Sequence, residues 1–210
     1  SQFLRNQDFP VVILAGSEQA LDQPFEFKKT KPKLNKIGLY PIVDRAEKLA
    51  QILPAIPELI QLRIKDLSGE QLEREIVKAV AMVKGTKSLL FINDYYQLAI
   101  KHKADGVHLG QEDLVTADIA SIQESGLYLG LSSHSYFEAA KAKQFNPSYI
   151  ALGPVYPTLL KQMSFSPQGP RPLQVWKKIF NCPVVAIGGI NTHNLAQVIA
   201  CSQVYVSVVR

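Results

Sequence analysis

From residue 38 onward, short apolar runs alternate with longer amphipathic stretches. Apolar runs that carry polar residues only near their ends are typical of strands buried on both faces of a parallel sheet. The pattern predicts eight such strands: Gly38 to Val43, Leu59 to Ile64, Ser88 to Ile92, Gly106 to Leu109, Tyr128 to Leu131, Tyr149 to Leu152, Val184 to Ile187 and Val204 to Val209.

The amphipathic stretches between these runs are predicted to be helices. Ser68 followed three residues later by Gln71 predicts a capping box, in which each side chain binds a backbone N–H group of the first turn. Ser135 with Glu138 repeats the pattern, and Gly126 suits the left-handed end of a helix. One apolar stripe follows the first of these caps: Leu72, Ile76, Val80 and Val83.

Eight strand-helix repeats favour an α/β fold of the (β/α)₈ TIM-barrel type. An open doubly wound sheet stays as the alternative, because periodicity does not show whether a sheet closes. The sequence ends at Arg210, directly after the eighth predicted strand. A barrel without its final helix is therefore expected, and the sequence leaves open whether that helix is truncated or absent.

The first 36 residues differ from the rest of the chain. Pro10, Pro24 and Pro32 interrupt them, and the strand-like run Val11 to Leu14 stands isolated. We expect a boundary near Lys36, with an N-terminal extension or linker over 1–36 and the barrel domain over 37–210. The extension could belong to a fused upstream domain or cover the barrel where the last helix is missing.

The net charge of +5 equals the charge of five lysines in this extension: Lys28, Lys29, Lys31, Lys33 and Lys36. The remainder of the chain is balanced, so a solvated basic linker is favoured over a nucleic-acid-binding face. No apolar run approaches the roughly 20 residues of a membrane span, and the first residues do not form a signal peptide. We expect a cytoplasmic protein without membrane or nucleic-acid partners, and the sequence leaves a homo-oligomer open.

Polar residues gather where the predicted strands end, and in a barrel these positions meet at one rim. Taken singly, each is explained equally well as a surface charge, a helix cap or a turn. Their shared position at successive strand ends favours function. The candidates are Gln61, Arg63, Lys65, Asn93, Asp94, His108, Asp113, Ser132, Ser133, His134, Thr158, Lys161, Gly188 and Gly189.

The side-chain types at these positions suit a polyphosphate held through a metal. Asp94 and Asp113 offer the carboxylate oxygens that Mg²⁺ prefers. Arg63 is able to bind phosphate oxygens in pairs, whereas Lys65 and Lys161 act as point charges. The two glycines at 188 and 189 allow backbone N–H groups to approach a second phosphate.

Five ordered motifs resemble thiamine-phosphate synthase over residues 37 to 209. They are Gln61-Leu62-Arg63-Ile64-Lys65, Phe91-Ile92-Asn93-Asp94, Gly106 to Asp113, Gly153-Pro154-Val155-Tyr156-Pro157-Thr158 with Lys161, and Ala186-Ile187-Gly188-Gly189-Ile190. The family joins 4-amino-2-methyl-5-(diphosphooxymethyl)pyrimidine to a thiazole phosphate on a TIM barrel with Mg²⁺, and releases pyrophosphate.

The resemblance implies a role for each matched residue. Asp94 and Asp113 would hold the metal. Gln61 and Ser132 would contact the pyrimidine, and Thr158 and Gly189, beside Gly188, would hold the thiazole phosphate. Arg63, Lys65, Asn93 and Lys161 would bind the pyrophosphate, with Arg63, Lys65, Ser132 and Lys161 supporting catalysis.

Two departures from the family pattern fall on the thiazole-phosphate side. Leu160 stands where the family usually has a hydroxyl, and Val208-Val209-Arg210 stands where it usually shows Val-Val-Ser. Three alternatives stay open, and the departures together with the missing final helix motivate the first of them. One is a ligand-binding or regulatory homologue without catalysis, and another is a thiazole tautomerase-like enzyme. The third, an aldolase using Lys65 or Lys161, is disfavoured because nearby carboxylates keep a lysine charged.

Overall fold

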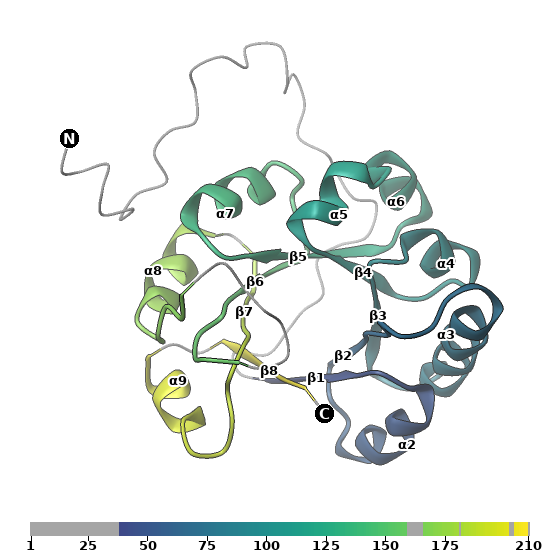
Figure 1. Ribbon diagram of the computed structural model, residues 1–210, viewed down its shortest axis with the longest axis horizontal. Helices are drawn as coiled ribbons and strands as arrows, with labels where there is room; N and C mark the ends of the chain where they lie inside the picture. The colour runs from purple at the N-terminus through teal and green to yellow at the C-terminus, as the bar shows by residue number, and fades with distance from the viewer. Residues whose placement is uncertain (1–37, 159–165, 181, 202–203, 210) are drawn as a thin grey trace, which may run out of the picture.

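Eight parallel strands close into a barrel, and helices surround it (Figure 1). The computed structural model describes residues 38–158, 166–180, 182–201 and 204–209. Strand β1 pairs with β2 on one side and with β8 on the other, from Gly38 opposite Tyr205 to Ile42 opposite Val209. This closure confirms the (β/α)₈ barrel and excludes the open doubly wound sheet.

All eight predicted strands are present, with some shifted ends. They are β1 (Gly38–Val43), β2 (Leu59–Leu62), β3 (Leu89–Asn93), β4 (Gly106–Leu109), β5 (Tyr128–Ser133), β6 (Tyr149–Leu152), β7 (Val184–Ala186) and β8 (Tyr205–Val209). Strand β5 extends two residues beyond the prediction because Ser132 and Ser133 pair with β6. Backbone pairing does not require apolar side chains, so hydropathy placed this end too early.

The helices alternate with the strands along the described chain. They are α2 (Leu49–Ile52), α3 (Gly69–Val83), α4 (Tyr96–Lys101), α5 (Gln111–Thr116), α6 (Ile119–Ser125), α7 (Tyr136–Lys143), α8 (Pro172–Ile179) and α9 (Leu195–Cys201), with the short 3₁₀ turns η1 (Ala46–Lys48) and η2 (Leu53–Ala55) between β1 and β2. No described helix combines the length and hydrophobicity needed to cross a membrane. The predicted extension over 1–36 lies outside the described residues.

The predicted helix caps have mixed outcomes. The capping box at Ser68 is wrong, because its hydroxyl makes no capping bond and Gly69, the next residue, turns the backbone to a φ of +53°. The Ser135 hydroxyl does accept from the Glu138 N–H at 3.2 Å. The Glu138 carboxylate, however, accepts from the backbone N–H of His134 instead of closing the box. Gly126 ends α6 with a φ of +72°, as predicted.

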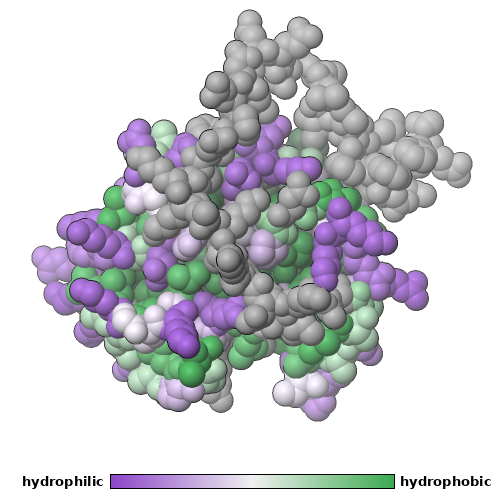
Figure 2. Space-filling model, turned by 180° about the vertical axis from the view of Figure 1, so that it is seen from behind, coloured by the Kyte–Doolittle hydropathy of each residue, from purple (hydrophilic) through white to green (hydrophobic). Residues whose placement is uncertain are grey.

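Helix α3 shows how the outer layer covers the sheet. Leu72, Ile76 and Val83 of the predicted stripe are buried, and Ala79 completes that face, with Val80 only partly buried beside it. Burial of one such side chain contributes about 1.5–3 kcal/mol. Charged residues occupy the opposite face of the helix, and hydrophilic side chains lie around the periphery of the molecule (Figure 2).

Aromatic rings fill the inside of the barrel, and glycines on neighbouring strands make room for them. An added Cβ would lie 2.1 Å from the ring of Tyr149 at Gly130, and contacts of 2.2 and 2.5 Å would occur at two more strands. The rings of Phe91 and Tyr149 meet edge-on at 5.2 Å between centroids. The three glycine and ring pairs are Gly38 with Tyr205, Gly106 with Phe91, and Gly130 with Tyr149.

A chain of hydrogen bonds crosses this aromatic interior. Gln61 Nε2 donates to the Tyr40 hydroxyl at 3.1 Å, and the Tyr40 and Tyr149 hydroxyls lie 2.5 Å apart. His108 joins the chain through Nδ1, 2.7 Å from the Tyr149 hydroxyl, and through Nε2, 2.7 Å from Ser132 Oγ. Five different strands therefore contribute to one continuous polar connection, which we call the relay.

Within the relay, His108 is a neutral ring. Burial is the main cause that lowers the pKa of His108 to about 3, and the positive charge of Arg63 lowers it further. The negative charge of Asp113 opposes the shift only in part. The imidazole is therefore uncharged throughout the physiological pH range.

Packing at Gly130 predicts that even one methyl group is not tolerated. We expect Gly130→Ala to displace the ring of Tyr149 and to lower the free energy of unfolding by about 1–3 kcal/mol. Urea denaturation measures the change, with Val115→Ala at an exposed position of α5 as the control. Equal stability of the two variants would contradict this packing.

The neutral state of His108 predicts a pH dependence of stability. Below about pH 6.5 the unfolded chain binds a proton at this residue, whereas the folded chain does so only near pH 3. As the pH falls through this window, the free energy of unfolding therefore decreases by about 1.4 kcal/mol per pH unit. His108→Gln cannot titrate, and we expect its stability to fall less steeply over the same range. Parallel stability curves for the variant and the unchanged chain, measured by denaturation from pH 7 to about 4, would refute the account.

Candidate active site

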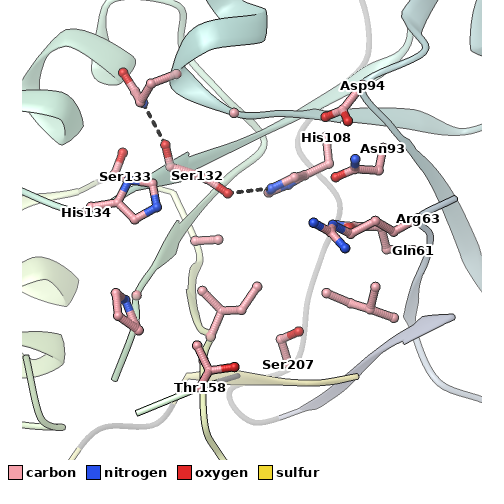
Figure 3. A pocket seen from close by; sticks show the side chains of 18 of the residues that line it. Gln61, Arg63, Asn93, Asp94, His108, Ser132, Ser133, His134, Thr158 and Ser207 are labelled. Carbon is pink, nitrogen blue, oxygen red and sulfur yellow. Dashed lines mark hydrogen bonds between the residues drawn. The ribbon is translucent and has the colours of Figure 1, made fainter. Parts of the chain in front are cut away.

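One pocket of about 430 Å³ lies at the rim formed by the carboxyl ends of the strands (Figure 3). Because all strands are parallel, side chains from their ends converge there. The structure brings ten predicted site residues together in its lining: Gln61, Arg63, Lys65, Asn93, Asp94, Asp113, Ser132, Thr158, Gly188 and Gly189. The predicted Lys161 and the departure at Leu160 lie outside the described residues.

Asp94 reaches the pocket through an unusual backbone conformation. Directly after β3, it has a φ of +65°, a region that aspartate adopts more readily than most residues. Its N–H donates to the carbonyl of His108 at 2.9 Å, and its own carbonyl accepts from Tyr96 at the start of α4. These bonds hold a sharp turn that ends the strand and places the carboxylate at the rim.

Two carboxylates and a lysine form the acidic end of the pocket. Lys65 Nζ donates to Oδ2 of Asp94, and Asp113 Oδ2 accepts from the backbone N–H of Gly110 at 3.2 Å. Burial raises the pKa of Asp113, and the negative charge of Asp94 raises it further. The two carboxylates are therefore near enough to repel each other, and a cation between them would relieve the repulsion.

The donor set decides which metal would fit this end. Within the described residues there is no group of three or more His, Cys, Asp and Glu side chains able to enclose an ion. Two carboxylates alone suit a hard divalent cation that completes its shell with water and substrate oxygens. Asp94 and Asp113 therefore fit such an ion better than zinc, which needs more protein ligands.

Arg63 supplies the free positive charge of the pocket. Its backbone N–H donates to the carbonyl of Val43 at 2.7 Å, which fixes the residue beyond the end of β2. Across the described chain, its guanidinium pairs with no carboxylate. Arg63, Gln61 and Asn93 come from adjacent strands and line the same wall (Figure 3). An anion entering the pocket would find the guanidinium available for paired hydrogen bonds.

The opposite wall is suited to a second anionic group. Gly188 and Gly189 have φ values of +95° and +65°, and an added Cβ at Gly189 would lie 2.3 Å from the carbonyl of Pro157. Only glycine fits this close turn, which brings backbone into contact with the pocket. Thr158 lies on the same side, with Ser207 of β8 near it (Figure 3).

Ser207 is a site residue that sequence reasoning missed. It is only 3% exposed, lines the pocket, and its hydroxyl has no hydrogen-bond partner among the described residues. A buried hydroxyl without a partner is costly, and a hydrogen bond to a ligand in the pocket would remove that cost. Strand alternation gave the signal, since Tyr205 also faces the barrel interior two residues earlier. The end of β8 thus provides a hydroxyl although Val208-Val209-Arg210 lacks one.

Three further members of the predicted set also line the pocket, and they are His108, Ser133 and His134. Ser133 is buried against the pocket, and its hydroxyl has no partner within the described chain. The His134 Nδ1 atom lies 2.9 Å from Glu138 Oε2, and Gln168 Nε2 donates to the His134 carbonyl at 2.6 Å. Glu138 was predicted only as a helix cap, yet it fixes a histidine that lines the pocket.

Comparisons with known proteins identify the family of the chain. A family model described as thiamine monophosphate synthase matches residues 39–210. The chain is 50% identical over 179 residues to thiamine-phosphate synthase of Serratia proteamaculans, covering 83% of each chain. It is 49% identical over 172 residues to that of Photorhabdus laumondii, covering 80% of this chain and 79% of the relative.

A solved structure shows the same relationship. Thiamine phosphate pyrophosphorylase from Pyrococcus furiosus superimposes with a TM-score of 0.72 at 29% identity, over 83% of this chain and 86% of that one. The resemblance carried by the five sequence motifs is thereby confirmed. By family match, identity and fold, the chain belongs to the thiamine monophosphate synthase family.

Proposed function

We propose that this pocket condenses 4-amino-2-methyl-5-(diphosphooxymethyl)pyrimidine with 4-methyl-5-(2-phosphooxyethyl)thiazole to give thiamine phosphate and pyrophosphate. The supporting observation is the division of one pocket into two anion-binding ends. Arg63, Lys65 and the two aspartates lie at one end, whereas Thr158 and the glycine turn lie at the other. Two phosphorylated small molecules would fit such a pocket together.

The acidic end is proposed to receive the pyrophosphate. Bound there by Asp94 and Asp113, Mg²⁺ would supply a Lewis acid for the phosphate oxygens. Arg63 and Lys65 carry positive charge to the same place, and Asn93 offers amide hydrogen bonds. As the carbon-oxygen bond to pyrophosphate breaks, negative charge grows on the leaving group, and these residues stabilise it. Lys161 is proposed to add a further positive charge.

Gln61 and Ser132 are proposed to hold the pyrimidine over the barrel interior. The relay fixes Ser132 Oγ against His108, and Gln61 is fixed against Tyr40. The methylene carbon that loses pyrophosphate is then kept within reach of the second substrate. Binding energy from the ring is used for orientation, which lowers the entropic part of the barrier.

The second substrate is proposed to bind through its phosphate at Thr158, Gly188 and Gly189, with the Ser207 hydroxyl as a further donor. Its ring nitrogen attacks the methylene carbon, so a carbon-nitrogen bond replaces the carbon-oxygen bond. The electron pair of the broken bond leaves with pyrophosphate. No proton has to move to or from the protein in this exchange.

Turnover assays test the proposed function directly. With both substrates and Mg²⁺, we expect equal amounts of thiamine phosphate and pyrophosphate. Arg63→Lys keeps the charge but loses the paired hydrogen bonds, so kcat/KM for the pyrimidine substrate should fall roughly 10- to 100-fold. The matched control is Arg74→Lys on the outer face of α3, which should leave turnover unchanged.

The same assay separates the alternatives. Binding of the pyrimidine diphosphate without any product would contradict the proposal and indicate a ligand-binding homologue. Isomerisation of a thiazole without consumption of pyrimidine would indicate a tautomerase-like enzyme. Turnover by Arg63→Lys equal to that of the Arg74→Lys control would refute the role given to the guanidinium.

Ser207→Ala tests the thiazole end of the pocket. Loss of one hydrogen bond predicts a KM for the thiazole phosphate raised roughly three- to tenfold, with the KM for the pyrimidine substrate unchanged. Ser121→Ala at the exposed start of α6 serves as the control. An increase in the KM for the pyrimidine substrate alone would place the Ser207 hydroxyl at the pyrimidine end and contradict this assignment.

A further inference from the structure

The relay links two walls of the pocket through residues that the proposed reaction does not otherwise use. Gln61 on β2 and Ser132 on β5 line the pocket, and Tyr40, Tyr149 and His108 connect them. Tyr40 and Tyr149 are 1% and 0% exposed, so bulk water does not reach their hydroxyls to form hydrogen bonds. Every bond of the relay therefore has to be made within it.

The direction of each bond follows from a count of protons. Burial raises the pKa of both tyrosines, so each hydroxyl keeps its single proton. Tyr40 accepts from Gln61 and hence donates to Tyr149, because its own proton would otherwise be buried without an acceptor. Tyr149 then donates to Nδ1 of His108.

His108 passes this direction on to the far wall. His108 is only 4% exposed and both ring nitrogens contact neutral hydroxyls, so a positive charge on the ring would be buried without a carboxylate in contact, which favours the neutral form. A neutral imidazole carries one N–H, and with Nδ1 accepting, that proton lies on Nε2. Nε2 therefore donates to Ser132 Oγ. The hydroxyl proton of Ser132 is then available as a donor to the pocket. At the opposite end of the relay, the side-chain carbonyl oxygen of Gln61 is available as an acceptor.

We propose that Tyr40, Tyr149 and His108 are positioning residues that couple the hydrogen-bond direction of Gln61 to that of Ser132. When Gln61 offers an acceptor to the pocket, Ser132 offers a donor, and neither changes alone. If the proposed function holds, this pair selects an aminopyrimidine, which brings amino N–H donors together with ring-nitrogen acceptors. An oxo analogue, with donor and acceptor exchanged, would require every bond of the relay and the Gln61 amide to reverse.

The tautomer of His108 reports the direction of the relay without any substrate. In ¹⁵N NMR of the full chain, we expect Nε2 protonated and Nδ1 unprotonated, with the signals assigned by their loss in His108→Gln. Gln61→Glu replaces a donor by a carboxylate that only accepts, so all bonds reverse and the proton moves to Nδ1. In Gln61→Leu, which adds no charge, we expect His108 to populate both tautomers. This variant provides the test if Gln61→Glu does not fold.

Tyr149→Phe interrupts the relay and supplies the decisive control. In that background, substitution of Gln61 should no longer move the His108 tautomer. Three results would overturn the proposal: an Nδ1–H ring in the unchanged chain, a tautomer insensitive to residue 61 while Tyr149 is present, or a response that persists in Tyr149→Phe. Because no substrate is added, these results hold or fail independently of the proposed reaction.

Kinetics then connect the relay to the proposed function. Tyr149→Phe should lower kcat/KM for the pyrimidine substrate about tenfold, with the KM for the thiazole phosphate unchanged. It should also reduce the preference for the aminopyrimidine over its oxo analogue. A general loss of folding would lower the apparent kcat with both substrates and leave both KM values unchanged, and an unchanged preference would contradict the selective role.

Discussion

Closure of the sheet between β1 and β8 is the constraint on which the site depends. The ladder from Gly38 opposite Tyr205 to Ile42 opposite Val209 leaves no edge strand and sets all eight carboxyl ends at one rim. Residues far apart in the sequence, such as Arg63 and Ser207, thereby line one pocket. An open sheet would spread the same side chains along a line, and its ligand crevice would lie only where the strand order reverses.

Below that rim, the same side chains fill the barrel interior and form its hydrogen bonds. The ring of Tyr149 occupies the space left by Gly130, and its hydroxyl joins the relay to His108. At the rim itself, charges of both signs are held close together, because Lys65 contacts Asp94 and the negative charge of Asp94 repels Asp113. The interior thus orients neutral groups, whereas the rim presents charges to the pocket.

Much of this could be predicted from the sequence, because strand burial and rim position both leave a pattern in hydropathy. Eight apolar runs gave the strands, and polar residues after them gave Arg63, Asp94 and the other candidates. Contacts between residues far apart in the sequence leave no such pattern in hydropathy. A tyrosine within an apolar run, such as Tyr149, is indistinguishable from ordinary core until its hydroxyl partner is known. The cap at Ser68 failed because Gly69 altered the backbone, and Ser207 was hidden in a strand expected only to be apolar.

The barrel brings Asp94 and Asp113 into one pocket, and we propose that they hold a divalent cation for the leaving pyrophosphate. Titration with Mn²⁺, followed by electron paramagnetic resonance in the presence of pyrophosphate, measures that site directly. We expect one tightly bound ion, with affinity lowered at least about tenfold by either Asp94→Asn or Asp113→Asn. Affinity that is unchanged in both variants would contradict the account.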